Sequence, residues 1–195
     1  HRLDKDTSGV MVVAKSDRAH QGLAAQFAEH SVERAYIAFT RNAPSPKAGR
    51  IETRIARASR DRKKFEVPHD PHSEAGKHAI TNYQTFARYG QAPDAAVGTA
   101  LAAKVECRLE TGRTHQIRVH MAHQGCPLLG DPVYGNRRGN ILATSDNGRE
   151  LRDFRRQALH AVILGFIHPV SGEHLRFESE LPKDLQRLEK FLERL

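Results

Sequence analysis

The sequence predicts an α+β fold built on a mixed, mainly antiparallel sheet with flanking helices. Most segments of strand character follow one another with few helical segments between them, which favours antiparallel neighbours over a doubly wound parallel sheet. The chain has 195 residues, enough for one domain. Its 28% charged and 38% hydrophobic residues are typical of a globular chain rather than a disordered one.

The N-terminal segment predicts a strand followed by a helix. Residues 9–14 are a short apolar run bounded by polar residues, which indicates a buried strand. Ser16 is a suitable N-cap for a helix over about 17–30. Leu23 and Phe27 are four residues apart and therefore lie on one face of that helix.

Further strands are predicted where β-branched and aromatic residues gather. They are expected at 32–40, near 51–58, and at 79–89, 101–110, 157–170 and 173–180. Residues 59–78 are rich in charged residues, Pro, Gly and His and predict a long loop. Residues 169–172 predict a turn. The end is helical, because Pro182 suits a first helical turn and leucines recur at helical spacing over 185–195.

Asp4 lies in the N-terminal sequence HRLDKDTSG. A carboxylate just before a buried strand, flanked by Arg2 and Lys5, can be held ionised by those cations. Such a carboxylate can act as a nucleophile or a general base. The alternative is an Asx turn, in which Asp4 or Asp6 only accepts hydrogen bonds from backbone N–H groups.

Residues 109–123 read LETGRTHQIRVHMAH and leave two structures open. Thr114 could cap a helix that stops at Gly125. Apolar residues also alternate from 117 to 121, which fits a strand equally well. In either case the basic residues that follow Gly112 suggest an anion-binding corner, in which arginines clamp a phosphate or pair with a catalytic carboxylate.

Histidines in the same segment raise the alternative of a metal site. His115, His120 and His123 are separated by five and three residues, whereas a zinc-binding helix has histidines four apart with a nearby Glu. Cys107 and Cys126 form no CxxC pair. We therefore expect no metal, and reduced thiols in a cytosolic protein.

The charge balance predicts a polyanionic partner. Lys and Arg number 31 against 23 Asp and Glu, giving a net charge of +8 and a pI near 9.8. Two basic stretches, 50–64 and 137–156, favour contact with a phosphate backbone. Aromatic residues are only 6% and Trp is absent, which argues against an aromatic platform for stacked bases. No apolar run is long enough to cross a membrane.

Taken together, the motifs resemble the RluA-type family of RNA pseudouridine synthases. The resemblance rests on HRLDKDTSG, ERAYIA, LETGRTHQIRVHMAH, GDPVYG and RQALHA, in that order along nearly the whole chain. It is strongest to the branch that acts on large-subunit ribosomal RNA, the synthase D type. The resemblance implies a bent mixed sheet with an RNA-binding cleft across it.

The resemblance also implies roles for individual residues. Asp4 would be the catalytic carboxylate and Arg118 its basic partner. Tyr36, which on its own reads as a half-buried core tyrosine, would stack near the target uracil and act in deprotonating C5. Arg2 would enter the space that the flipped uridine leaves, and Ile117 would help to wall the pocket.

Further expectations concern substrate, cofactors and extent. Arg113 and His115 are expected to bind the substrate, which would be structured RNA, large-subunit rRNA first and tRNA second. No cofactor motif is present, so none is expected, and we expect a cytoplasmic monomer. Because the family's catalytic domain begins before HRLD, residues 1–195 are expected to be that domain without its N-terminal portion. Any S4-type RNA-binding domain would lie outside this chain.

Two other functions remain open from the sequence. The first is a catalytically silent RNA-binding or ribosome-assembly protein that uses the same basic cleft. The second is a carboxylate-based glycoside or nucleoside hydrolase, which needs a second catalytic carboxylate, for which Asp6 is the near candidate.

Overall fold

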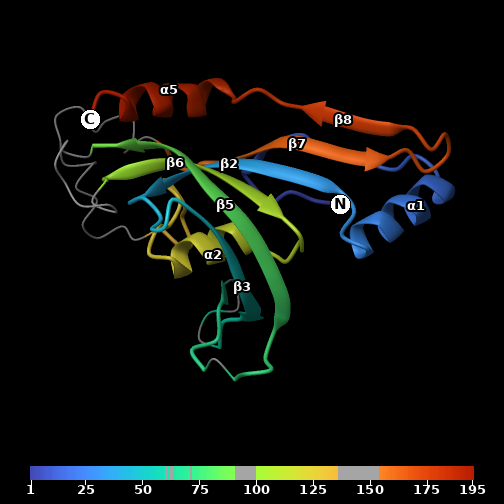
Figure 1. Cartoon of the computed structure of the whole chain (residues 1–195), viewed down its shortest axis with the longest axis horizontal. Coiled ribbons are helices and arrows are strands. Elements are labelled where there is room, and N and C mark those ends of the chain that lie inside the picture. Colours follow the sequence, from blue (N-terminus) through green and yellow to red (C-terminus); the bar gives the residue numbers. More distant parts are fainter. Residues whose placement is uncertain (60, 62–63, 71, 91–99, 136–153) are drawn as a thin grey trace.

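The fold is a single bent sheet with helices on both faces (Figure 1). The computed structural model describes residues 1–59, 61, 64–70, 72–90, 100–135 and 154–195. Its strands are β1 (Ser8–Gly9), β2 (Glu33–Arg41), β3 (Ala48–Arg57), β4 (Phe65–Glu66), β5 (Lys77–Tyr89), β6 (Ala102–Leu109), β7 (Leu159–Ile167) and β8 (His174–Glu178). Its helices are α1 (Asp17–Ala28), α2 (Gln116–His123) and α5 (Lys183–Leu192).

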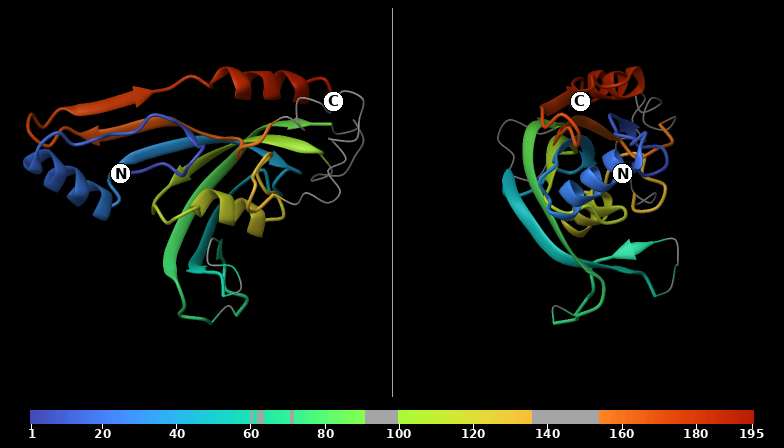
Figure 2. Two further views of the ribbon diagram at one scale, coloured as in Figure 1. Left: turned by 180° about the vertical axis from the view of Figure 1, so that it is seen from behind. Right: turned by 90° about the vertical axis from the view of Figure 1, so that its right-hand side faces the viewer.

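The predicted fold class is confirmed. The strand order is β1-β7-β2-β6-β5-β3-β4. β8 also pairs with β7, further along that strand than β1 does. Among the described strands only β1 and β7 pair in parallel, and all other pairs are antiparallel. The sheet is strongly bent: β7 and β8 run across Figure 1, whereas β3 and β5 run down it. Figure 2 shows the same bend from two other sides.

Strand β2 is the centre of the fold, and its side chains alternate between two cores. Tyr36 and Ala38 point to a core that includes α2, whereas Ile37 and Phe39 point to a core that includes α5. All residues from 34 to 40 are buried. A strand covered on both faces reads as a continuous apolar run rather than an alternating one.

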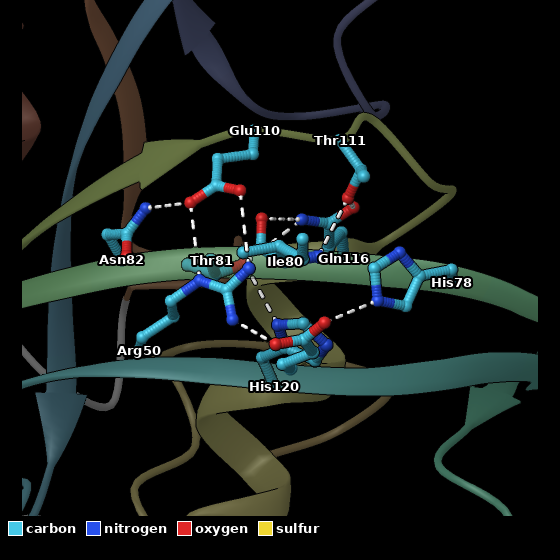
Figure 3. Close-up of polar contacts among 10 residues, drawn as sticks. Arg50, His78, Ile80, Thr81, Asn82, Glu110, Thr111, Gln116 and His120 are labelled. Atoms are coloured by element: carbon cyan, nitrogen blue, oxygen red, sulfur yellow. Dashed lines mark hydrogen bonds and ion pairs between the residues drawn. The ribbon is translucent and has the colours of Figure 1, made fainter.

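Helix α2 is fixed to the sheet by the amide of Gln116, which uses all of its hydrogen-bonding capacity. Figure 3 shows its contacts with Ile80, Thr81 and Thr111. Its Nε2 donates to Ile80 O at 2.8 Å and to Thr81 Oγ1 at 3.0 Å. Its Oε1 accepts from Thr111 Oγ1 at 2.7 Å and from Arg113 N at 2.9 Å. The start of α2 is therefore tied to both β5 and the end of β6.

One turn further along α2, His120 is fully buried and bridges two strands. Its Nδ1 lies 2.9 Å from Thr81 Oγ1 and its Nε2 lies 3.0 Å from Thr53 Oγ1. Thr81 Oγ1 already accepts from the Gln116 amide, so we assign its own proton to His120 Nδ1 and the ring proton to Nε2. Burial lowers the pKa of His120 to about 4, so the bridging imidazole is neutral.

The predicted strand at residues 9–14 is wrong beyond its first residue. β1 ends at Gly9, and residues 10–14 form no strand. The edge of β7 that would continue to pair with them is occupied by β8 from Ile163 to Ile167. Val10, Val12 and Ala14 instead pack in the core under α1, while Met11 and Val13 are 49% and 68% exposed.

Three other expectations need adjustment. The loop predicted over 59–78 contains the short strand β4 and the start of β5. The alternatives for the third motif are resolved in favour of a helix, whose N-cap is His115 rather than Thr114. Pro182 is itself the N-cap of α5 rather than a first-turn residue.

The predicted basic stretch at 137–156 lies mostly outside the described residues, which resume at residue 154.

The neutral, buried His120 predicts a pH-dependent stability. Its pKa in the folded chain, about 4, is below the ordinary value of 6.5, so the unfolded chain takes up a proton first as the pH falls. The stabilising contribution is complete above pH ~6.5 and is lost between there and pH ~4, a total of about 3 kcal/mol. Urea unfolding of the wild type and His120→Gln across this range measures it.

We expect the His120→Gln chain to lose less stability than the wild type as the pH falls. The control is His174→Gln, which removes an exposed histidine of β8 and should leave the pH dependence as in the wild type. Parallel curves for the wild type and His120→Gln would contradict the assignment.

Candidate active site

A cleft of about 480 Å³ opens between the N-terminal loop, α1, β2 and the start of α2. Its walls combine a polar part near Asp4 with an apolar part near α1. The side chains and backbone that line it belong to His1, Arg2, Leu3, Asp4, Thr7, Val12, Ala14, His20, Leu23, Ala24, Phe27, Arg34, Tyr36, Leu109, Gly112, Arg113, His115, Gln116, Ile117 and Leu159. Segments that are far apart in the sequence therefore meet at one site.

Asp4 is held by an arginine that is shared between two carboxylates. Arg118 Nη1 donates to Asp4 Oδ2 at 3.3 Å. The same guanidinium donates from Nε and Nη2 to the two oxygens of Asp131, at 2.8 and 3.0 Å. This two-pronged geometry fixes the plane of the guanidinium and so directs its remaining edge to Asp4.

Burial differs sharply between the two carboxylates of this cluster. The side chain of Asp131 is fully buried and that of Arg118 is 4% exposed, whereas the Asp4 side chain is 21% exposed. Burial lowers the pKa of Arg118, but the hydrogen bonds and charge of Asp131, with a smaller contribution from Asp4, outweigh burial and raise it. Asp131 therefore acts as the structural counter-ion, and Asp4 is the carboxylate that a substrate can reach.

Asp131 also shapes the turn that follows it. Its Oδ1 accepts from the backbone N–H groups of Val133 and Tyr134 at 2.8 and 3.0 Å. The Tyr134 ring lies against the Arg118 guanidinium, with 5.1 Å between the guanidinium carbon and the ring centroid. The GDPVYG motif thus positions Arg118 from two sides.

The loop that carries Asp4 is anchored by the RQALHA motif. Gln157 Nε2 donates to Lys5 O at 2.6 Å and to Thr7 Oγ1 at 2.9 Å. Arg156 Nη1 donates to Asp6 O at 3.2 Å. Because Asp6 has a left-handed backbone, with φ of 68°, the loop is sharply turned and depends on these contacts.

Tyr36 projects into the cleft from the middle of β2 and is 7% exposed. The pairing of β2 with β7 is irregular between Ala35 and Tyr36. Burial raises the pKa of the Tyr36 hydroxyl, and Asp4 adds to this rise, while Arg34 opposes it. The phenol is therefore protonated when the cleft is empty.

His115 is caged at the cleft wall by two aromatic rings. Phe65 and Tyr134 make edge-to-face contacts with it, at 5.8 and 5.6 Å between ring centroids. Tyr134 Oη accepts from Phe65 N and lies 2.9 Å from His115 Nδ1, so we assign the tyrosine proton to the bond with Nδ1. Burial lowers the pKa of His115, and the proton of the neutral ring is then on Nε2, for which the described residues supply no hydrogen-bond acceptor.

Six of the predicted site residues line this cleft: Arg2, Asp4, Tyr36, Arg113, His115 and Ile117. Arg118 does not line the cleft, but its guanidinium donates to Asp4, which does. Among the described residues no group of three or more His, Cys, Asp and Glu has the geometry of a metal site.

Sequence reasoning missed Asp131, Gln157 and Arg34. For Asp131 a signal was available, because Asp-Pro after Gly indicates a capped turn. For Arg34 the signal was its place two residues before Tyr36, which puts both side chains on one face of a strand. The role of Gln157 depends on a contact across more than 150 residues of sequence, which no local pattern reveals.

The chain is similar in sequence to known proteins over almost its whole length. A sequence model of the family described as RNA pseudouridylate synthase matches residues 1–123. A Zymomonas mobilis protein named ribosomal large subunit pseudouridine synthase D is 47% identical over 192 residues, which cover 98% of this chain and 55% of that protein. A protein of the same name from Xanthomonas campestris is 47% identical over 189 residues, covering 96% and 52%.

A solved structure has the same fold. The human RNA pseudouridylate synthase domain containing 1 protein superposes with a TM-score of 0.70 at 30% sequence identity, covering 93% of this chain and 68% of that one. The chain spans about half the length of the curated relatives it matches.

The shared guanidinium predicts that Asp131 is needed for stability. We expect Asp131→Asn to lower the free energy of unfolding by about 3 kcal/mol, because it leaves a buried arginine without its main counter-ion while keeping the turn acceptor. Urea denaturation measures the loss. The matched control is Asp184→Asn, which breaks a more exposed pair with Arg156 and should cost less than about 1 kcal/mol. Equal losses in the two variants would contradict this account.

Proposed function

The chain belongs to the RNA pseudouridylate synthase family, and from this premise we propose that it isomerises uridine to pseudouridine in structured RNA. The observation that carries the proposal is the position of Asp4. It is a partly exposed carboxylate in a cleft, held by Arg118 and close to Tyr36. This is the arrangement that the sequence motifs imply for the reaction.

The isomerisation breaks one bond of the nucleotide and forms another. The N1–C1′ bond breaks, the uracil turns while bound, and C5 bonds to C1′. C5 then loses its proton and N1, freed from C1′, gains one, so the atoms balance without a redox step. Asp4 serves as the carboxylate that either attacks the nucleotide, forming a bond that breaks again before pseudouridine is released, or removes the C2′ proton and returns it when C5 bonds to C1′. Arg118 keeps the carboxylate oriented. Tyr36 assists the loss of the C5 proton by accepting it while its own phenol proton passes to solvent, so that the phenol ends protonated as it began.

The target base must leave its stack to enter the cleft, which costs a few kcal/mol. Arg2 lies exposed at the cleft and can enter the vacated space as a cation. Ile117 supplies an apolar wall, and the Nε2–H of His115 can donate to a uracil carbonyl or a phosphate oxygen. Arg113 is held by its Nε bond to His78 O at 2.8 Å, which aims a second cation at the cleft.

The distribution of ion pairs favours the cleft as the RNA-binding face. On the face of the sheet that carries α5, Arg50, Arg108 and Arg176 each pair with glutamates. On the cleft face, no carboxylate pairs with Arg2, Arg34 or Arg113 within the described part of the chain. Unpaired cations bind phosphates more favourably, because no existing ion pair must be broken first.

Large-subunit rRNA is the proposed substrate, ahead of tRNA, because two of the most similar relatives are named for the large ribosomal subunit. The proposal includes a monomer that acts in the cytoplasm. It also includes a catalytic domain that extends beyond residues 1–195, in keeping with the greater length of the relatives. No helix in the described residues is long and apolar enough to cross a bilayer.

A hydrolase that uses two carboxylates is disfavoured by the position of Asp6. Asp6 is not part of the cleft wall and instead lines a separate hollow next to Arg156 and α5. A catalytically silent RNA-binding protein remains the competing function. The effect of replacing Asp4 on turnover and on RNA affinity distinguishes the two.

Tritium release from C5-tritiated uridine in large-subunit rRNA tests the proposal. Residues 1–195 and the full-length protein are assayed separately, on transcripts and on ribosomal subunits, with EDTA present. We expect release by the full-length protein and a loss of at least about 10³-fold in Asp4→Asn, because the reaction loses its carboxylate while RNA affinity changes little.

Asp6→Asn is the matched control, since asparagine also accepts a left-handed backbone and the side chain lies outside the cleft. It should retain release within a fewfold of the wild type. Absence of release from every wild-type preparation would favour the silent RNA-binding protein. Equal loss of RNA affinity and turnover in Asp4→Asn would make Asp4 a structural residue.

A further inference from the structure

Arg34 is a buried cation on the wall of the cleft. It lies two residues before Tyr36 on β2, so both side chains face the same side of the sheet. It is only 7% exposed. Its Nη2 donates to Glu110 O at 3.2 Å, which holds the guanidinium near the end of β6.

The described residues do not compensate this charge. No carboxylate forms an ion pair with Arg34, and its buried Nε has no hydrogen-bond acceptor among them. Arg118, the other buried arginine of the site, pairs with two carboxylates. An uncompensated buried charge is unfavourable by several kcal/mol, so a group of this kind calls for a physical explanation.

The surroundings of Arg34 leave room for its guanidinium but supply only weak partners. Phe27 of α1 packs against it, with 5.5 Å between the guanidinium carbon and the ring centroid. On another side lies Gly112, where a β-carbon would come within 2.6 Å of Arg34 Nη1. Glycine at this position therefore allows Arg34 to occupy the cleft wall.

The missing partner has a defined chemistry. It must be an anion, because a neutral carbonyl would leave the charge uncompensated, and it must reach a cleft that a nucleotide occupies. The phosphate of an RNA backbone meets both conditions, and arginine is the side chain best suited to it. We propose that Arg34 binds an RNA phosphate next to the nucleotide held in the cleft, an inference that rests on the proposed function.

The proposal is tested by removing the charge on each side of the contact. Arg34→Met keeps a long side chain without charge. RNAs with one neutral methylphosphonate linkage, placed in turn at each position flanking the target uridine, remove single phosphate charges. Affinities of the full-length protein are measured for each combination across a range of salt concentrations.

We expect Arg34→Met to weaken RNA binding about tenfold, the loss of one charge-assisted contact. The slope of log K against log salt should fall in magnitude by about 0.7 to 0.9, the value for one phosphate. One methylphosphonate position should weaken wild-type binding by a similar factor and should not weaken Arg34→Met further. Arg34→Lys should keep the salt slope, because the cation remains.

Stability of the RNA-free protein separates this role from a structural one. If the partner of Arg34 is an RNA phosphate, Arg34→Met removes an unfavourable buried charge from the RNA-free protein. The midpoint of its thermal unfolding should then be unchanged or higher. A clear fall in the midpoint of the full-length protein would show that another part of that protein is the partner, and would overturn the proposal.

The matched control is Arg108→Met, which removes an arginine paired with Glu33 and Glu106 on the opposite face of the sheet. It should leave RNA affinity and salt slope unchanged. If Arg34→Met shifts the pH profile of kcat and leaves binding intact, Arg34 acts on Tyr36 instead and the proposal is wrong. These binding measurements need no turnover, so they fail or succeed independently of the tritium assay.

Discussion

The structure of the site depends on the buried ion pair between Arg118 and Asp131. A guanidinium that is 4% exposed is costly to bury alone, and Asp131 offsets this cost with two hydrogen bonds of good geometry. The pair also sets the charge of the cluster formed by Arg118, Asp131 and Asp4. One cation shared by two carboxylates leaves this cluster with a net charge of −1, and Asp4 is its more exposed carboxylate. Asp4 is thus oriented by Arg118 without being fully neutralised by it.

The rest of the fold serves to bring that cluster together. Arg118 stands on α2, which Gln116 and His120 fix to β5 and β3 through hydrogen bonds in the interior. Asp4 stands on a loop that has little secondary structure of its own and is held by Gln157. The sheet provides the rigid base for both, because β2 is covered on its two faces and pairs with β6 and β7 along its length.

Local patterns were sufficient for the central sheet and insufficient where packing is non-local. β2, β5 and β6 were predicted because β-branched and aromatic residues cluster in them. α2 was ambiguous because its apolar residues face two different cores, Ile117 and Met121 one and Val119 the other, so no single amphipathic stripe is visible. The strand expected at 9–14 failed because β8 occupies the edge it would need. Motif resemblance predicted Asp4, Tyr36 and Arg118 as site residues, whereas the local signal at Asp131 indicated only a capped turn, and its pairing with Arg118 is visible only in the structure.

The two buried arginines of the site are treated in opposite ways, and the difference has a physical logic. Arg118 has permanent counter-ions because it must hold one geometry whether or not a substrate is present. If Arg34 had a permanent counter-ion, each incoming RNA phosphate would have to displace it. The affinity for RNA would then be reduced by the free energy of that ion pair. Leaving Arg34 uncompensated makes the empty cleft less stable and the occupied cleft relatively more so. Under the proposed function, the free energy that folding forgoes at this position is available to hold the RNA against the cost of flipping its base.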